Sequence, residues 1–135
     1  MSASPSLAGA RRARVAARNA DRGAFLAERV RIADTRWART VGLLGSRDLG
    51  NGEGLWIVPS RGVHTLGMRF TIDVVAIDHG GVVVDVVPRM NPWRIRLPRA
   101  GTAGVLELPA GVLERTRTEI GDHIAFDVWI PDHDA

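Results

Sequence analysis

Apolar and polar residues alternate along several short stretches of the chain, and this pattern predicts β-strands. Val30 and Ile32 alternate with polar neighbours, as a strand with one buried face requires, so the first strand is expected to begin at Arg29. Proline and turn-forming residues separate the later apolar runs. Strands are therefore predicted at 29–34, 55–58, 73–78, 82–87, 103–108 and 123–130, with a further short strand near 93–96.

Two of these runs form a predicted hairpin. Residues 73–78 and 82–87 are rich in valine and isoleucine, which favour strands. His79-Gly80-Gly81 separates them, and a short glycine-containing connection between two apolar runs is typical of a hairpin turn. The two strands are expected to pair in antiparallel fashion.

Two short helices are also predicted. Trp37, Val41 and Leu44 recur at helical spacing after a possible N-cap at Asp34-Thr35, and Gly45 would end that helix. A second helix is expected over 112–120, between Gly111 and Gly121, with an apolar face formed by Val112, Leu113, Thr116 and Ile120.

These elements indicate an α+β fold of about seven short strands and two short helices. The helices do not alternate with strands, so parallel βαβ units are not expected. The sheet should be antiparallel or mixed and should curl toward a barrel. The length of 135 residues predicts one domain.

The positive charge of the chain is concentrated at its beginning. The net charge is +3, yet residues 1–31 hold seven arginines and only two acidic residues. Residues 1–28 are therefore predicted to be a basic, disordered leader, residues 29–131 the domain and residues 132–135 a tail. The alternative is that the arginines of 11–31 contact phosphate backbones or anionic lipid.

Several chemistries are excluded by residues that the chain lacks. It has no cysteine, which excludes disulfides, thiolate metal sites and cysteine nucleophiles, and all 18 of its basic residues are arginine. No stretch is apolar enough for a signal peptide or a membrane span, so a soluble, cytoplasmic protein is expected. The four histidines have no metal-binding spacing, and no nucleophile elbow or phosphate-binding glycine motif occurs. Neither a cofactor nor a metal is predicted.

Six motifs in order resemble those of a known family, the bacterial and archaeal domain of unknown function 192. They span roughly residues 30–127 and are Arg39-Thr-Val-Gly-Leu-Leu-Gly45, Gly54-Leu-Trp-Ile, Val63-His-Thr-Leu-Gly-Met68 with Ile72-Asp73-Val-Val-Ala-Ile-Asp78, Pro92-Trp93-Arg94, Val105-Leu-Glu-Leu-Pro-Ala-Gly111 and Ile120-Gly-Asp-His-Ile-Ala-Phe126. The resemblance implies a compact, mostly β domain that is often exported in other members, and it implies no agreed activity. His64-Thr65 and Gly67-Met68 are similar to one subgroup, whereas many members carry a Phe-Trp-Met-Lys-Asn type segment there.

The matching motifs contain the candidate site. His64 could act as a base near neutral pH, with Asp73 or Glu107 orienting its ring, while Arg94 could bind an anionic group. Met68 and Trp93 would contact the ligand. The alternative is structural: Asp73 would accept backbone N–H groups, Glu107 would pair with Arg94, and His64 would donate to a carbonyl.

Three functions remain open from the sequence. The favoured one is a non-catalytic binding or assembly module whose loop at Trp93 and Arg94, beside His64, receives a small anion or a protein partner. The second is an enzyme that uses His64 with Asp73 or Glu107 as an acid–base pair. The third is an accessory factor that contacts nucleic acid or membrane through residues 11–31, a role the neutral remainder of the chain does not favour. The sequence does not define an oligomeric state.

Overall fold

The computed structural model describes residues 13–34, 48–60, 63–65, 68–96 and 99–130, except for the side chains of Val63, His64 and Trp129. The elements of this part of the chain are ten strands, two of them only two residues long, and one short helix. They are β1 (Arg14–Asn19), β2 (Ala24–Ala27), β3 (Arg29–Ala33), β4 (Glu53–Ile57), β5 (Val63–His64), β6 (Ile72–Asp78), β7 (Val83–Met90), β8 (Ile95–Arg96), β9 (Thr102–Pro109), α3 (Val112–Thr116) and β10 (Ile124–Trp129).

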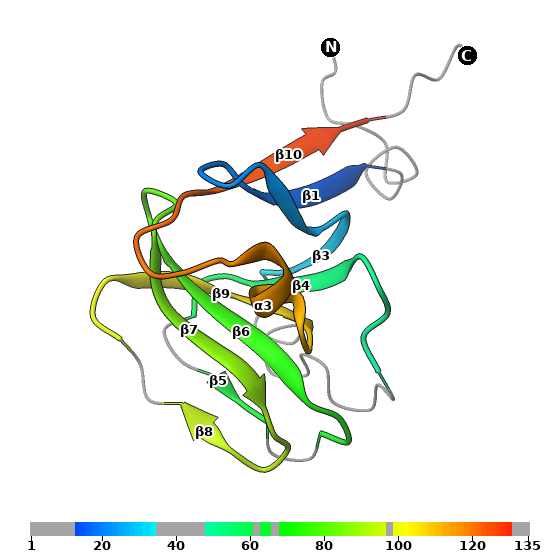
Figure 1. Cartoon of the computed structure of the whole chain (residues 1–135), viewed down its shortest axis with the longest axis vertical. Helices are drawn as coiled ribbons and strands as arrows, with labels where there is room; N and C mark the ends of the chain where they lie inside the picture. Colours follow the sequence, from blue (N-terminus) through cyan, green and yellow to red (C-terminus); the bar gives the residue numbers. More distant parts are fainter. Residues whose placement is uncertain (1–12, 35–47, 61–62, 66–67, 97–98, 131–135) are drawn as a thin grey trace.

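The strands form three separate sheets. The largest has the order β3-β4-β9-β6-β7, and only its β3–β4 pair is parallel. A three-stranded antiparallel sheet, β10-β1-β2, joins the two ends of the described chain, and β5 pairs with β8. Figure 1 shows β1 and β10 above the large sheet, α3 in front of it, and β5 and β8 at the lower end.

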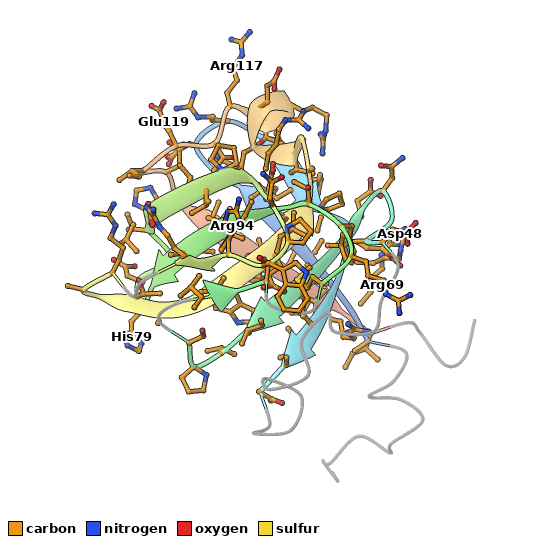
Figure 2. The ribbon with its side chains drawn as sticks, turned by 90° about the horizontal axis from the view of Figure 1, so that it is seen from below. Asp48, Arg69, His79, Arg94, Arg117 and Glu119 are labelled. Carbon is orange, nitrogen blue, oxygen red and sulfur yellow. The ribbon has the colours of Figure 1, made fainter. Side chains whose placement is uncertain are left out.

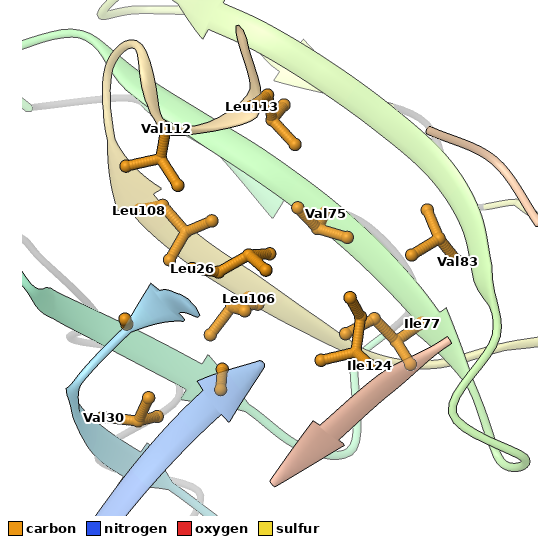
Figure 3. Packing of buried hydrophobic residues seen from close by; sticks show 12 residues of the cluster. Leu26, Val30, Val75, Ile77, Val83, Leu106, Leu108, Val112, Leu113 and Ile124 are labelled. Carbon is orange, nitrogen blue, oxygen red and sulfur yellow. The ribbon is translucent and has the colours of Figure 1, made fainter. Parts of the chain in front are cut away.

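Each side of the large sheet carries its own apolar cluster. The first cluster lies between the sheet and the layer formed by β1, β2, β10 and α3, and Figure 3 shows Leu26 of β2 close to Leu106 and Leu108 of β9. The second cluster lies on the opposite side and includes Met68. Alternation along the strands produces this division, because successive side chains of a strand point to opposite faces. The members of the second cluster are Ala33, Leu55, Ile57, Met68, Ile72, Val74, Met90 and Val105.

Most of the strand predictions are confirmed. The strand at Arg29, the hairpin formed by β6 and β7, and the strands β4, β9 and β10 lie within a few residues of the predicted ranges. The expected barrel is wrong, because the strands of the described chain form three sheets that do not close on one another. The described strands also outnumber the seven predicted. The helix predicted after Asp34 lies outside the described residues.

The second predicted helix is shorter than expected. It ends at Thr116 because Arg117 adopts a left-handed backbone conformation, with φ of 58°, and its N–H bonds to the carbonyl oxygen of Glu114. Ile120, predicted to extend the apolar face, is 59% exposed. The glycine at 121 therefore terminates a turn and not the helix.

The largest difference from the prediction concerns residues 14–27. They were expected to belong to a disordered leader, yet they form β1 and β2, and Ala17 and Leu26 are almost fully buried in the first cluster. Residues 1–12 of that expected leader lie outside the described residues, as do residues 132–135 of the expected tail.

A buried polar network holds β1 and β2 in place. The Asn19 side chain is fully buried, and its amide nitrogen donates to Thr118 Oγ1 and Asp122 Oδ2, each at 3.0 Å. Arg22 Nε donates to Asp122 Oδ2 at 2.7 Å. This bond from Arg22, with the bond from Asn19, lowers the pKa of Asp122 to about 2. The network joins the turn after β1 to the loop before β10.

Candidate functional site

One face of the molecule is built from two segments that are distant in the sequence. β5 pairs with β8 in antiparallel fashion, so that His64 lies opposite Ile95. Trp93 and Arg94 directly precede β8, and the backbone therefore brings three of the predicted site residues together. Figure 2, which views the molecule from below, shows Arg94 near the centre of this face. The His64 side chain lies outside the described atoms.

Thr65 holds the two segments together. Its side chain is fully buried, and its hydroxyl donates to the carbonyl oxygen of Asn91 at 2.7 Å and accepts from the N–H of Arg94 at 2.8 Å. Its own N–H donates to the carbonyl oxygen of Arg94, and its carbonyl oxygen accepts from the N–H of Trp93. These four bonds fix the backbone of the turn at 91–94. We call Trp93, Arg94 and Ile95 the docking loop.

The docking loop presents two large apolar side chains to solvent. Trp93 and Ile95 are each 65% exposed, and Arg94 between them is also exposed. Trp93 has a φ of 64°, a left-handed conformation that non-glycine residues rarely adopt. The Arg94 guanidinium makes a weak bond, 3.4 Å long, to the carbonyl oxygen of Trp93. The side chains of Trp93 and Ile95 are therefore exposed, while the backbone of the loop is held by its bonds to Thr65.

The contacts of Met68 and Asp73 stabilise the fold, because Met68 packs in an apolar cluster and Asp73 binds backbone N–H groups. Met68 is 5% exposed and packs in the second cluster. Asp73 is fully buried, its Oδ1 accepts from the N–H of Arg89 at 2.8 Å, and its Oδ2 accepts from the N–H groups of Gly111 and Leu113 at 3.1 and 2.8 Å. Both oxygens are thus occupied by backbone donors that link β6, β7 and α3. The structural interpretation from the sequence describes Asp73 better than an acid–base role does.

Glu107 is the unusual member of the predicted set. It lies in β9 between Leu55 of β4 and Val74 of β6, and these cross-strand neighbours belong to the second cluster, so the Glu107 side chain shares their face. It is 3% exposed and makes no hydrogen bond or ion pair with the described residues. Burial raises its pKa to about 7.

The ion pair expected between Glu107 and Arg94 is not formed. Arg96 pairs instead with a buried carboxylate, since its Nε and Nη2 donate to Asp85 Oδ2 and Oδ1 at 2.9 and 3.1 Å. Arg99 Nε lies 3.4 Å from the same carboxylate, which is only 4% exposed as a residue. This group attaches β8 to β7. Its signal in the sequence was an aspartate inside a run of valines.

Four of the five described arginines in residues 1–31 are engaged within the molecule. Arg18 pairs with Asp127, Arg22 with Asp122, and Arg14 with Glu28, while Arg29 donates to the carbonyl oxygen of Asn51. The expected basic leader is thus, over this stretch, part of the folded surface. That arrangement weakens the prediction of a nucleic-acid or membrane contact through these residues.

Within the described residues, no three histidine or acidic side chains gather closely enough to hold a metal ion. No helix in that part of the chain is long and apolar enough to cross a membrane.

The fold and the site together define a small, mostly β domain with two apolar clusters, a buried carboxyl group and an exposed aromatic loop. The chain belongs to the family DUF192, described as "Uncharacterized ACR", whose model matches residues 17–126. The match begins inside β1, in agreement with the structure. The family resemblance seen in the motifs is thereby confirmed.

Relatives and solved structures extend this result without assigning an activity. A UPF0127 protein of Thermococcus sibiricus is 35% identical over 115 residues, which cover 82% of this chain and 73% of the relative. A crystal structure of a protein of unknown function from Novosphingobium aromaticivorans superposes with a TM-score of 0.70 at 22% identity and covers 82% of each chain. One from Sinorhizobium meliloti, named as a candidate transcription regulator, has a TM-score of 0.72 at 22% identity and covers 84% of this chain and 92% of its own. The two structures show a shared fold.

Proposed function

We propose that this domain is a non-catalytic binding module that recognises a protein partner through the docking loop of Trp93, Arg94 and Ile95. The observation that carries the proposal is the conformation of Trp93, a large apolar side chain that is 65% exposed on a left-handed backbone. Such a conformation costs about 1 kcal/mol or more for a non-glycine residue. The backbone N–H groups of Trp93 and Arg94 donate to Thr65, and these bonds keep the conformation in place.

The chemistry of the loop supports a protein partner over a small molecule. Tryptophan and arginine are enriched among the residues that dominate binding energy at protein interfaces. Two apolar side chains of equal exposure flank the arginine, and a projecting loop fits a recess on another protein better than it encloses a small ligand. Because the backbone is already fixed, little conformational entropy would be lost on binding.

The test immobilises the wild-type, Trp93→Ala and Val128→Ala chains and compares the proteins that each retains from a lysate of cells that naturally make this protein. A partner should be retained by the wild-type chain and lost by Trp93→Ala. Val128→Ala is the matched control, since Val128 is 61% exposed on β10, outside the loop. Equal retention of every bound protein by all three chains, or retention of none, would rule out the docking loop as the binding surface.

A second function, acid–base catalysis, is favoured by one observation at Glu107. A carboxyl group that is buried, lacks a partner in the described residues and has a pKa of about 7 could transfer a proton near neutral pH. Of the two carboxylates considered as partners of His64, Asp73 already has both oxygens occupied, which leaves Glu107.

The pairing of His64 with Glu107 can be tested without a substrate. If the two side chains interact, Glu107→Gln should lower the pKa of the His64 ring, followed by NMR titration, because a neighbouring carboxylate stabilises the protonated ring. The exposed His79 serves as the internal control. An unchanged His64 titration would remove the acid–base pair.

A further inference from the structure

A cavity of about 500 Å³ opens where β1 meets β3, and no residue of the docking loop lines it. Its apolar surface includes Val30, a member of the first cluster, Val15, which packs against that cluster, and Leu49, which packs against the second. The volume falls within the range of pockets that hold small organic ligands. The cavity therefore has both the size and the apolar floor that such a ligand needs.

Three arginines line the same cavity. Arg29 and Arg31 are exposed on β3 on either side of the buried Val30, so both point to one face of the strand, about 7 Å apart. Arg14 reaches the cavity from β1. The Arg29 guanidinium is positioned by a bond of 2.9 Å from Nη2 to the carbonyl oxygen of Asn51, and that of Arg14 by a bond of 3.2 Å from Nε to the carbonyl oxygen of Glu28.

Arg31 differs from the other two because, among the described residues, it has no hydrogen bond or ion pair. Asp48, which also lines the cavity, is likewise without a partner there, and the two do not pair with each other. The second acidic residue of the lining, Glu53, uses Oε1 to accept the N–H of Gly50 at 2.8 Å. The cavity thus carries more positive than negative charge, and it offers one unpaired cation.

We propose that this cavity binds a small molecule that carries a phosphate or carboxylate group on an apolar or ring-shaped body. Arg31 would pair with the anionic group, since a guanidinium matches both anions in a two-pronged geometry. Arg29 and Arg14 would add positive potential. The floor of Val15 and Val30 would contact the apolar body, and Asp48 would accept a hydrogen bond from a hydroxyl or amine of the ligand. This site is independent of the docking loop.

The experiment titrates the full chain with four probes at constant ionic strength and follows backbone amide shifts by NMR. Adenosine 5′-monophosphate and ribose 5-phosphate carry phosphate, benzoate carries a carboxylate, and adenosine is the uncharged comparison. At least one anion should bind saturably, with the largest shifts at 13–15 and 29–31, and adenosine should bind much more weakly. The anion that binds most tightly distinguishes a phosphate ligand from a carboxylate ligand.

Two charge-matched variants locate the site. Arg31→Ala should weaken binding of the anion about tenfold, the loss expected for one charge-assisted contact. Arg117→Ala removes the same charge from an exposed position that does not line the cavity, at the upper edge of the view in Figure 2, whereas Asp48 lies at the right. This variant should leave the affinity unchanged. Asp48→Asn should tighten binding of inorganic sulfate, which is fully deprotonated, has no proton to donate to Asp48 and is repelled by its charge.

Three results would overturn the proposal. The first is the absence of saturable binding by all three anions. The second is adenosine binding as tightly as its monophosphate, which would make the anionic group irrelevant. The third is an equal loss of affinity in Arg31→Ala and Arg117→Ala, which would show a general effect of net charge and no site.

Discussion

At the scale of the residue, Glu107 and Gly104, three positions apart on β9, affect the stability of this buried strand in opposite ways. Gly104 leaves room for the ring of Trp56, which itself packs against Phe126 with ring centroids 4.9 Å apart. Glu107 instead brings an ionisable group into an apolar environment. The first feature favours the folded state, whereas the second opposes it at neutral pH and above.

Gly104→Ala is expected to destabilise the protein. An added Cβ would lie 2.5 Å from the Trp56 ring and 3.0 Å from the carbonyl oxygen of Ile57, so one of them must move. Overpacking of this kind costs about 1–3 kcal/mol, measured as the free energy of unfolding in urea. Gly80→Ala is the control, because its nearest neighbour, Asp78 Oδ1, would be 3.5 Å away. Equal stability of the two variants would contradict the close packing.

Glu107→Gln is expected to stabilise the protein at pH 8. The folded state holds the pKa of Glu107 at about 7, above its ordinary value of 4.5, so stability is fully present below pH 4.5 and declines as the pH rises through 7. A shift of that size corresponds to about 3 kcal/mol of free energy of unfolding, which the neutral glutamine would recover.

The pH dependence of urea unfolding between pH 4 and 8 measures this effect. In the Glu107→Gln variant, the decline with rising pH should be largely absent. Glu114→Gln is the control, because the Glu114 side chain is 82% exposed. A wild-type chain that loses no stability over this range would refute the raised pKa.

The sequence singled out Asp73 and Glu107 as candidates by residue type, but it could not predict the surroundings of either carboxyl group. Asp73 and Glu107 are both carboxylic acids with similar apolar neighbours in the sequence. Asp73 accepts hydrogen bonds from three backbone N–H groups, whereas Glu107 accepts none from the described residues. The difference arises from where the ends of β7 and α3 lie in space. Local sequence pattern carries no information about such distant donors.

At the scale of the element, the hydrogen bonds of Thr65 hold the backbone of the docking loop in one conformation. Thr65→Val keeps the shape of the side chain but removes the hydroxyl that bonds to Asn91 and Arg94. It should lower the free energy of unfolding by about 1–3 kcal/mol, the cost of leaving buried partners unsatisfied. It should also speed hydrogen exchange of the Arg94 amide. Thr71→Val is the control, because the Thr71 hydroxyl makes only an exposed bond to the Asn91 side chain. Similar exchange rates of the Arg94 amide in both variants would show that Thr65 does not hold the loop.

The elements that the sequence predicted correctly are those with long β-branched runs, such as β6 and β7, or strict alternation, such as β3. β1 escaped prediction because Arg14-Val-Ala-Ala-Arg-Asn19 consists of small and charged residues. Its strand character comes from pairing on both sides, with β10 and β2, and from the Asn19 network. Tertiary context thus decided a segment whose composition is typical of a flexible terminus.

At the scale of the whole molecule, the layer of β1 and β2 is a structural requirement of the domain. A chain of residues 28–135, which the sequence alone would have suggested, lacks Ala17, Leu26 and Ala27 from the first cluster. We expect it to show no cooperative thermal transition by circular dichroism, whereas residues 13–135 should unfold in one step. A cooperative transition of the shorter chain, close to that of the longer one, would show that β1 and β2 are dispensable.

The pairing of β1 with β10 also has a consequence for the order of events during synthesis. Arg18 and its partner Asp127 are 109 positions apart, so β1 emerges from the ribosome long before the strand that it needs. At a synthesis rate of about 5–20 residues per second, the backbone groups of β1 that pair with β10 stay unpaired for on the order of 5–20 seconds. Such an edge is a template for pairing with other chains. The arginines of β1, by repelling one another on neighbouring nascent chains, would then protect the protein before it has folded.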